Sequence, residues 1–119
     1  MNTEQELQAL GKTAPRITEN AIEDNIASEW YFTAAQGVIG APPSGHNDGP
    51  VPETLSLLTI CVLVLVNGFS VTGTSACASP DNFDADIGRK VARRNALNHI
   101  WPLMGYELRT KLHAEEQGS

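Results

Sequence analysis

The Asn67-Gly68 pair near the middle of the chain constrains the fold more than any other feature. It separates two β-rich runs, residues 57–66 and 69–77. Asn-Gly between such runs predicts a β-hairpin with a two-residue type I′ turn, because both residues tolerate the positive φ angles that this turn requires. The sequence therefore predicts two neighbouring antiparallel strands joined at this point.

A two-residue turn also predicts which residues lie opposite each other on the two strands. The predicted pairs are Val66 with Phe69, Val64 with Val71, and Val62 with Gly73. The first strand is apolar on both faces, so we expect it to be central and covered. The second strand is apolar on one face only and is expected nearer an edge.

The first of three expected helices covers residues 18–29. Thr18 is a good N-cap residue, and Ile22, Ile26 and Trp30 recur every four positions, which is typical of one stripe of an amphipathic helix. A short strand is expected directly after it, at residues 31–33.

Two further helices are expected after the hairpin, over residues 80–100 and 103–112. Ser79 and Pro80 suit the start of the first of them, and Pro102 is expected to end it. Its predicted buried stripe consists of Phe83, Ile87 and Val91, joined further along by Leu97, Ile100 and Trp101. Gly88 beside this stripe indicates a close crossing over the sheet, since glycine otherwise costs about 1 kcal/mol in a helix.

Together these elements predict an α+β protein, with a small antiparallel sheet packed by helices on one face. We expect a single domain over residues 17–112, between a flexible polar tail at 1–16 and a frayed tail at 113–119. Residues 37–53 are rich in proline and glycine and are expected to form a long loop.

The charge distribution narrows the functional classes. The chain of 119 residues has a net charge of −6, and residues 1–55 contain eight acids and two bases. General nucleic-acid binding normally requires a basic surface, so it is disfavoured. The start of the chain does not resemble a signal peptide, and the longest apolar run, residues 55–66, is too short for a membrane helix. A cytoplasmic location without membrane contact is expected.

Four basic residues form the main candidate for ligand binding: Arg89, Lys90, Arg93 and Arg94. Their spacing places them on one broad helical face, where guanidinium groups could hold a small anionic ligand such as a nucleotide phosphate. The alternative is that they pair with Asp86 or with the acidic N-terminal half of the chain.

Aromatic residues supply a second candidate surface, composed of Trp30, Tyr31, Trp101 and Tyr106. Aromatic side chains often dominate protein interfaces, but core packing is the alternative role. Homo-oligomer formation stays open.

Residues with metal-binding or catalytic chemistry give no recognisable motif. Asp81, Asp84 and Asp86 suit the positive end of a helix, and the three histidines are far apart in sequence. Cys61 and Cys77 are expected to be free, unreactive thiols. We therefore expect no catalytic residue, no metal site and no cofactor.

Three stretches together resemble a family of small tailed-phage proteins named after gene product 49 of one phage and gene 66 of another. They are residues 61–77 with Asn67-Gly68-Phe69, residues 87–93, and residues 100–108 with Trp101-Pro102-Leu103. The resemblance covers about residues 17–36 and 55–112. It implies a phage-encoded protein acting inside a bacterial cell, and it carries no catalytic residues over to this chain.

The leading functional hypothesis is a non-catalytic phage accessory protein that binds a host or phage macromolecule, a protein partner above all, to blunt a defence or redirect metabolism. The first alternative is a protein that sequesters a signalling nucleotide through the basic helix face. The second alternative is a small hydrolase of unknown type.

Overall fold

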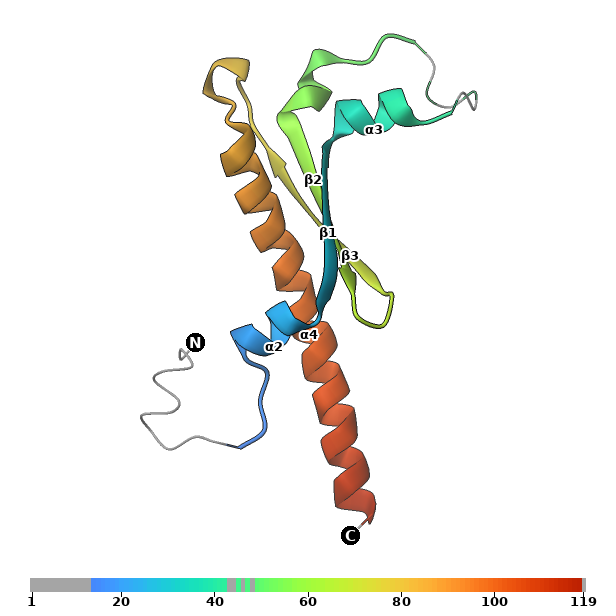
Figure 1. The fold of residues 1–119 in the computed structure, drawn as a ribbon, viewed down its shortest axis with the longest axis vertical. Helices are drawn as coiled ribbons and strands as arrows, with labels where there is room; N and C mark the ends of the chain where they lie inside the picture. The colour runs from blue at the N-terminus through green and yellow to red at the C-terminus, as the bar shows by residue number, and fades with distance from the viewer. Residues whose placement is uncertain (1–13, 43–44, 46, 48, 119) are drawn as a thin grey trace.

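The computed structural model describes residues 14–42, 45, 47 and 49–118. Its centre is an antiparallel sheet in the order β1-β2-β3, formed by β1 (Ile26–Thr33), β2 (Leu58–Leu65) and β3 (Ser70–Ala76). The long helix α4 (Ala85–Gly118) crosses one face of this sheet (Figure 1). The predicted α+β class is confirmed. Most of the expected polar tail at 1–16 lies outside the described residues.

The expected helix over residues 18–29 is wrong beyond its first two turns. Thr18 does cap a helix, since its hydroxyl accepts the amide of Ala21 at 3.0 Å, but α2 (Glu19–Asp24) ends before Asn25. From Ile26 the chain forms β1, which pairs with β2 along nearly its whole length. The ladder with β2 and the β-favouring run from Trp30 to Thr33 outweigh the helical spacing of the apolar residues.

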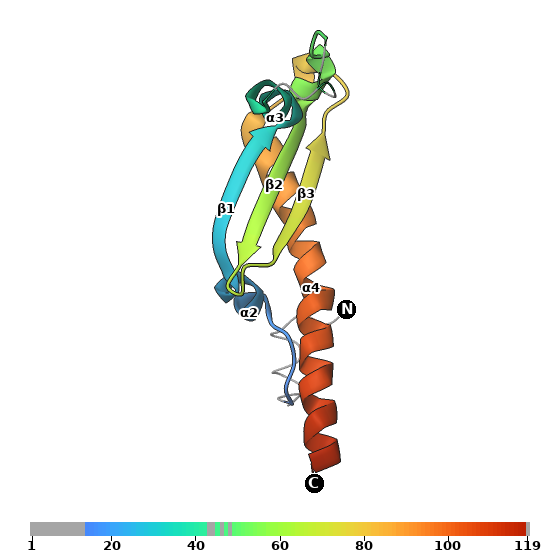
Figure 2. The ribbon, with the colours of Figure 1, turned by 90° about the vertical axis from the view of Figure 1, so that its right-hand side faces the viewer.

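The short helix α3 (Ala34–Gly40) occupies the first part of the expected 37–53 loop. It begins with a capping box, in which the Thr33 hydroxyl accepts the amide of Gln36 at 3.2 Å and the Gln36 side chain accepts the amide of Thr33 at 2.9 Å. The 3₁₀ helix η1 (Glu53–Leu57) begins at the last residue of that loop and leads into β2. Figures 1 and 2 show α3 at one end of the sheet, on the side opposite α4.

The hairpin is confirmed, but the predicted turn and register are wrong by one residue. The amide of Leu65 donates to the carbonyl of Phe69 at 2.8 Å, which leaves a loop of three residues, Val66 to Gly68. Gly68 has a φ of 92°, whereas no non-glycine residue in the described part of the chain has a positive φ. Asn67 therefore does not adopt the conformation that a type I′ turn requires, and the loop has a glycine at its left-handed position instead.

This register decides which side chains lie under α4. Leu63 lies opposite Val71, and Cys61 lies opposite Gly73. Val62 and Val64, predicted to pair with Gly73 and Val71, point to the other face of the sheet, where they lie opposite the β3 residues Thr72 and Ser70. The first hairpin strand is central as expected, but α4 covers only one of its two faces (Figure 2).

The two helices expected at 80–100 and 103–112 form one helix. The segment Pro80–Asn82 is a separate 3₁₀ turn, η2, and α4 starts later, where the Asp84 carboxylate accepts the amides of Asp86 and Ile87 at 2.9 and 3.2 Å. Pro102 lies inside α4. It removes one backbone hydrogen bond, but strong helix formers such as leucine, glutamate and lysine follow it and continue the helix.

The second half of α4 extends beyond the end of the sheet (Figure 2) and includes residues 113–118 of the expected frayed tail.

Small residues allow α4 to approach the sheet closely. Ile100 is buried as predicted, but the first part of the predicted stripe, Phe83, Ile87 and Val91, is wrong by one position, and Ile87 is 59% exposed. The stripe that packs on the sheet consists of Gly88, Ala92, Ala96 and Ile100. At Gly73 of β3 an added Cβ would lie 2.2 Å from the carbonyl oxygen of Ala92 and from the amide nitrogen of Ala96. The helix backbone thus rests directly on the strand backbone.

The contact at Gly73 predicts a large effect of a single methyl group. We expect Gly73→Ala to lower the free energy of unfolding by about 3 kcal/mol or more, because rigid helix backbone would have to move away from the sheet. Gly105→Ala is the matched control, since nothing lies within 4 Å of its added Cβ. The control should raise stability by about 0.5–1 kcal/mol through helix propensity. Urea unfolding followed by circular dichroism tests both, and equal stability of the two variants would contradict this packing.

Candidate functional site

Arg93 is the centre of an ion cluster that joins three elements of the fold. From α4 its guanidinium group donates to both carboxylate oxygens of Glu23 in α2, at 3.0 and 2.7 Å. It also donates to both oxygens of Glu29 in β1, at 3.0 and 3.2 Å. The hydroxyl of Tyr31 donates to Glu29 at 2.7 Å and completes the cluster. Arg93 therefore fastens α2 and β1 to the long helix.

The pKa values in this cluster follow from these contacts. Hydrogen bonds from Arg93 lower the pKa of both Glu23 and Glu29 below the ordinary value of 4.5. The two carboxylates in turn raise the pKa of Arg93. Burial and the bond to Glu29 raise the pKa of Tyr31, so its hydroxyl stays protonated as a donor. The cluster is ionised at neutral pH, and its one guanidinium and two carboxylates leave a net charge of −1.

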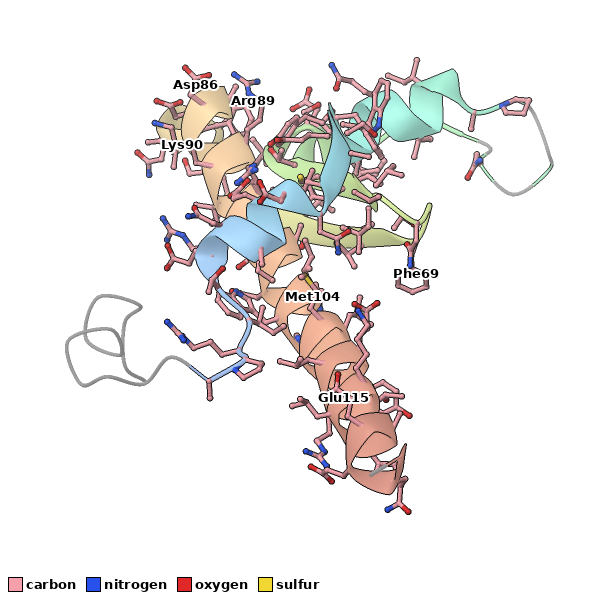
Figure 3. All side chains as sticks on the ribbon, turned by 60° about the horizontal axis from the view of Figure 1, so that its bottom comes forward. Phe69, Asp86, Arg89, Lys90, Met104 and Glu115 are labelled. Atoms are coloured by element: carbon pink, nitrogen blue, oxygen red, sulfur yellow. The ribbon has the colours of Figure 1, made fainter. Side chains whose placement is uncertain are left out.

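The four basic candidates therefore differ in their surroundings. Arg93 has two carboxylate partners, and Arg89 is paired with Asp86 one turn before it. These are the intramolecular pairings that the sequence left open as an alternative. Among the described residues, Lys90 and Arg94 are exposed and show no ion pair. Figure 3 shows Asp86, Arg89 and Lys90 close together at the start of α4.

A shallow depression of about 440 Å³ lies beside this helix start. It is lined by Tyr31, Asp86, Arg89, Lys90 and Arg93. Tyr31 and Arg89 also line a second hollow of about 370 Å³, which continues toward Phe83 and the start of α3. Three of the four predicted basic residues thus share one hollow with an aromatic ring, and Arg94 does not contribute to it.

The four predicted aromatic interface residues do not form one surface. Trp30 is 60% exposed on the face of the sheet away from α4, and Tyr106 is 78% exposed on the projecting part of α4. Tyr31 and Trp101 are half-buried against the core. Sequence spacing could not separate these roles, because they depend on which strand face α4 covers.

Among the described residues, the acids and cysteines that were further candidates for metal binding or catalysis are explained by the fold. Asp84 caps α4 and Asp86 pairs with Arg89, as expected for acids at a helix start. No group of three metal-ligating side chains occurs within the described residues, and His46 falls outside them. Both cysteines are free. Burial raises the pKa of the Cys61 thiol, so it is protonated and unsuited to nucleophilic attack.

Sequence reasoning missed one exposed group of hydrophobic side chains. Phe69 at the hairpin and Leu103 of α4 line a hollow of about 340 Å³ together with His99. Phe69 is 56% exposed and Leu103 is 41% exposed, and Tyr106 lies one helical turn beyond Leu103. We call Phe69, Leu103 and Tyr106 the arm patch. Only a continuous helix through Pro102 brings these residues together, so the expected helix end at that proline concealed the patch.

The Arg93 cluster predicts how stability depends on pH. Because the folded-state pKa values of Glu23 and Glu29 lie below 4.5, their contribution is present above that pH and is lost as the pH falls through the folded-state values. We expect Arg93→Met to lower the free energy of unfolding at pH 7 by about 1 kcal/mol, a value reduced for partial exposure of the pairs. The difference from the wild type should shrink toward pH 3.

Arg94→Met is the control for this prediction, since Arg94 has the same chemistry and no ion pair in the described structure. Its stability should stay close to wild type at every pH. Urea unfolding at a series of pH values measures both variants, and equal losses for the two would contradict a role of the cluster in holding α2 and β1.

A comparison with protein-family models identifies the family of the chain. Searches of curated proteins and of solved structures find no match. Among the described helices, none has the length and apolar content needed to cross a membrane. The model of the phage protein (N4 Gp49/phage Sf6 gene 66) family matches residues 17–112, which includes the sheet, the Arg93 cluster and most of α4. The chain therefore belongs to the phage N4 Gp49/Sf6 gene 66 family.

Proposed function

We propose that this phage protein is a non-catalytic accessory protein that acts in the cytoplasm of the bacterial host by binding a host or phage protein. The role in infection that we infer is to blunt a host defence or redirect host metabolism. Membership of a phage family supports the setting. The arm patch is the observation that carries the binding role.

The arm patch has the features of a contact surface. Phe69 and Leu103 flank one hollow, and Tyr106 extends the same helical surface by one turn, so the three side chains are continuous. Figure 3 shows Phe69 at the tip of the hairpin, clear of the strands, and Met104 on the neighbouring part of α4. Grouped exposed hydrophobic residues of this kind mark interaction sites in soluble proteins. Aromatic residues at the centre of an interface often contribute about 2 kcal/mol or more each.

The surroundings of the arm patch favour a protein partner over a nucleic acid. The net charge of the chain is −6. Along the projecting part of α4, acids and bases pair with each other, as in Arg109 with Glu116 and Lys111 with Glu107. A phosphate backbone would meet no excess of positive charge there. An apolar partner surface would bury the aromatic rings without breaking these pairs.

If the arm patch binds a protein partner, truncating its side chains should weaken recovery of that partner. Tagged protein expressed during phage infection should recover a protein at stoichiometric level. The double variant Leu103→Ala/Tyr106→Ala should weaken that recovery at least about tenfold, because two contact side chains are truncated. Alanine preserves helix propensity at both positions.

Ile87→Ala is the matched control, since it also removes an exposed apolar side chain from α4, but at the other end of the helix. It should recover the partner as well as the wild type does. Absence of any stoichiometric partner for the wild type, or equal recovery by the double variant, would count against the proposal.

A second candidate function rests on the depression beside Tyr31. We infer that a small anionic ligand, such as a signalling nucleotide held for sequestration, is the class that an aromatic ring with Arg89 and Lys90 would suit. Arg93 adds no net positive charge to this hollow, because its two carboxylate partners outweigh its single charge. Lys90 is therefore the basic residue with the most to contribute.

Calorimetry with a panel of cyclic nucleotides tests the second candidate. Binding should release measurable heat, and Lys90→Ala should weaken it by about tenfold, the effect of one lost charged contact. Arg94→Ala serves as control because Arg94 lies outside the hollow. The absence of heat with every nucleotide would eliminate this candidate and would leave the protein-binding proposal unaffected.

A further inference from the structure

Apart from α3 at one end, where Gly37 lies against the ring of Phe32, no described α-helix covers the face of the sheet opposite α4 (Figure 2). We call it the open face. Strand register identifies its members as Ser28, Trp30 and Phe32 of β1; Leu58, Ile60, Val62 and Val64 of β2; and Ser70, Thr72, Thr74 and Ala76 of β3. Its central strand is wholly aliphatic, and Trp30 beside it is 60% exposed.

A solvent-facing sheet surface does not normally have this composition. In an antiparallel sheet with one wet face, the outward positions are usually polar and alternate with the apolar inward ones. The inward positions of β2 are buried under α4, and its four outward positions are aliphatic as well. Burying these four aliphatic side chains would contribute about 25 cal/mol for each Å² of apolar surface removed from water. The pattern is that of a strand covered on both sides.

The open face can be buried at little polar cost. None of its members is ionisable. The indole N–H of Trp30 already donates to the Ser28 hydroxyl at 2.9 Å, so covering the ring leaves no unpaired donor. The hydroxyl groups on β3 lie along one edge of the face, where they can keep contact with water.

We propose that the open face is the interface of a homodimer, in which a second copy of this chain packs its own open face on the first. An uncharged face is compatible with a second copy of itself, so charge does not oppose a dimer in this position. Two chains of net charge −6 repel each other wherever their acidic surfaces meet, but this face is neutral on both copies. A partner selected by opposite charge would find nothing to pair with here. Face-to-face packing under a two-fold axis gives the sandwich arrangement in which sheets lie about 10 Å apart.

The size of the face shows how much of a dimer interface the three strands alone can supply. Three strands of seven or eight residues measure about 25 by 14 Å, or roughly 350 Å² in projection. Stable dimers bury about 800 Å² of each copy, so elements beyond the strands must contribute.

The helix α3 is placed to make that contribution, because it rises from one end of the sheet on the open side (Figure 1). If the strands of the two copies run in opposite senses, α3 of each copy reaches the hairpin end of the other. Ile39 of α3 and Val66 of the hairpin turn, 71% and 68% exposed, then both gain apolar cover.

The dimer does not depend on the proposed partner binding, and the two can be tested separately. The hollow that Phe69 and Leu103 line meets the open face only at the β3 edge, through Ser70 and Thr72. Leu103 and Tyr106 belong to α4, on the other side of the sheet, so a dimer through the open face leaves these two side chains accessible.

Sedimentation velocity over a range of concentrations tests the dimer with the purified full chain. The wild type should sediment at about twice the monomer mass of 12.8 kDa, with a dissociation constant in the micromolar range or tighter. Trp30→Glu should weaken the dimer about a hundredfold or more, because it places a carboxylate in an apolar interface. Ile87→Glu, an equally exposed apolar position away from the face, should leave the dimer intact.

Circular dichroism confirms that each variant is folded, and Thr72→Glu, at an exposed position of the same face, replaces Trp30→Glu if the latter is not. A wild type that stays monomeric at all concentrations would overturn the proposal. A dimer that neither open-face variant weakens would also overturn it, since the interface would then lie elsewhere.

Spin labels test the orientation of the two copies. A label on Ile39→Cys, in a Cys77→Ser background, should report a distance of about 25 Å or more between copies, the length of the strands. A distance below about 15 Å would place both α3 helices at the same end and would overturn the opposed arrangement.

Discussion

The direct contact between the backbone of α4 and that of β3 determines the rest of the structure. Gly73 is enclosed by Ala92 and Ala96, with no space for a single added carbon. Because the helix can approach this closely only over glycine, the contact selects which face of the hairpin is buried. The selected face contains Cys61, Leu63 and Leu65, all nearly inaccessible to solvent. The opposite face of the same strand is consequently left open, although its residues are equally apolar.

The sequence predicted the hairpin and the fold class because both depend on local chemistry. It failed on the register because β2 is apolar on both faces, so the hydrophobic pattern fits either of two registers that differ by one residue. The packing of α4 against Gly73 determines which of the two is formed. Asn67 keeps a negative φ, and Gly68 alone provides the left-handed residue of a longer loop. The helix through Pro102 was missed for a related reason. A proline usually ends a helix, but the helix formers that follow it outweigh one lost hydrogen bond.

In the candidate site, too, contacts between residues close in sequence could be predicted, whereas contacts between residues far apart in sequence could not. Arg89 pairs with Asp86 three residues away, which spacing alone suggested. Arg93 pairs with Glu23 and Glu29, which are 70 and 64 residues away in sequence, so only the fold identifies its partners. Arg93, one of the four basic residues predicted to bind a ligand, instead holds α2 and β1 in place. The surfaces left for binding are apolar, and they lie on opposite sides of the sheet.

Hydrogen–deuterium exchange of the intact protein tests the central contact most directly. If α4 rests on the sheet through Gly73, the amides of β2 and of α4 up to about residue 101 should exchange slowest, while those beyond residue 103 exchange much faster. The boundary should fall where the helix leaves the sheet, near Ile100. Uniform protection along the whole of α4, or rapid exchange in its first half, would contradict the account.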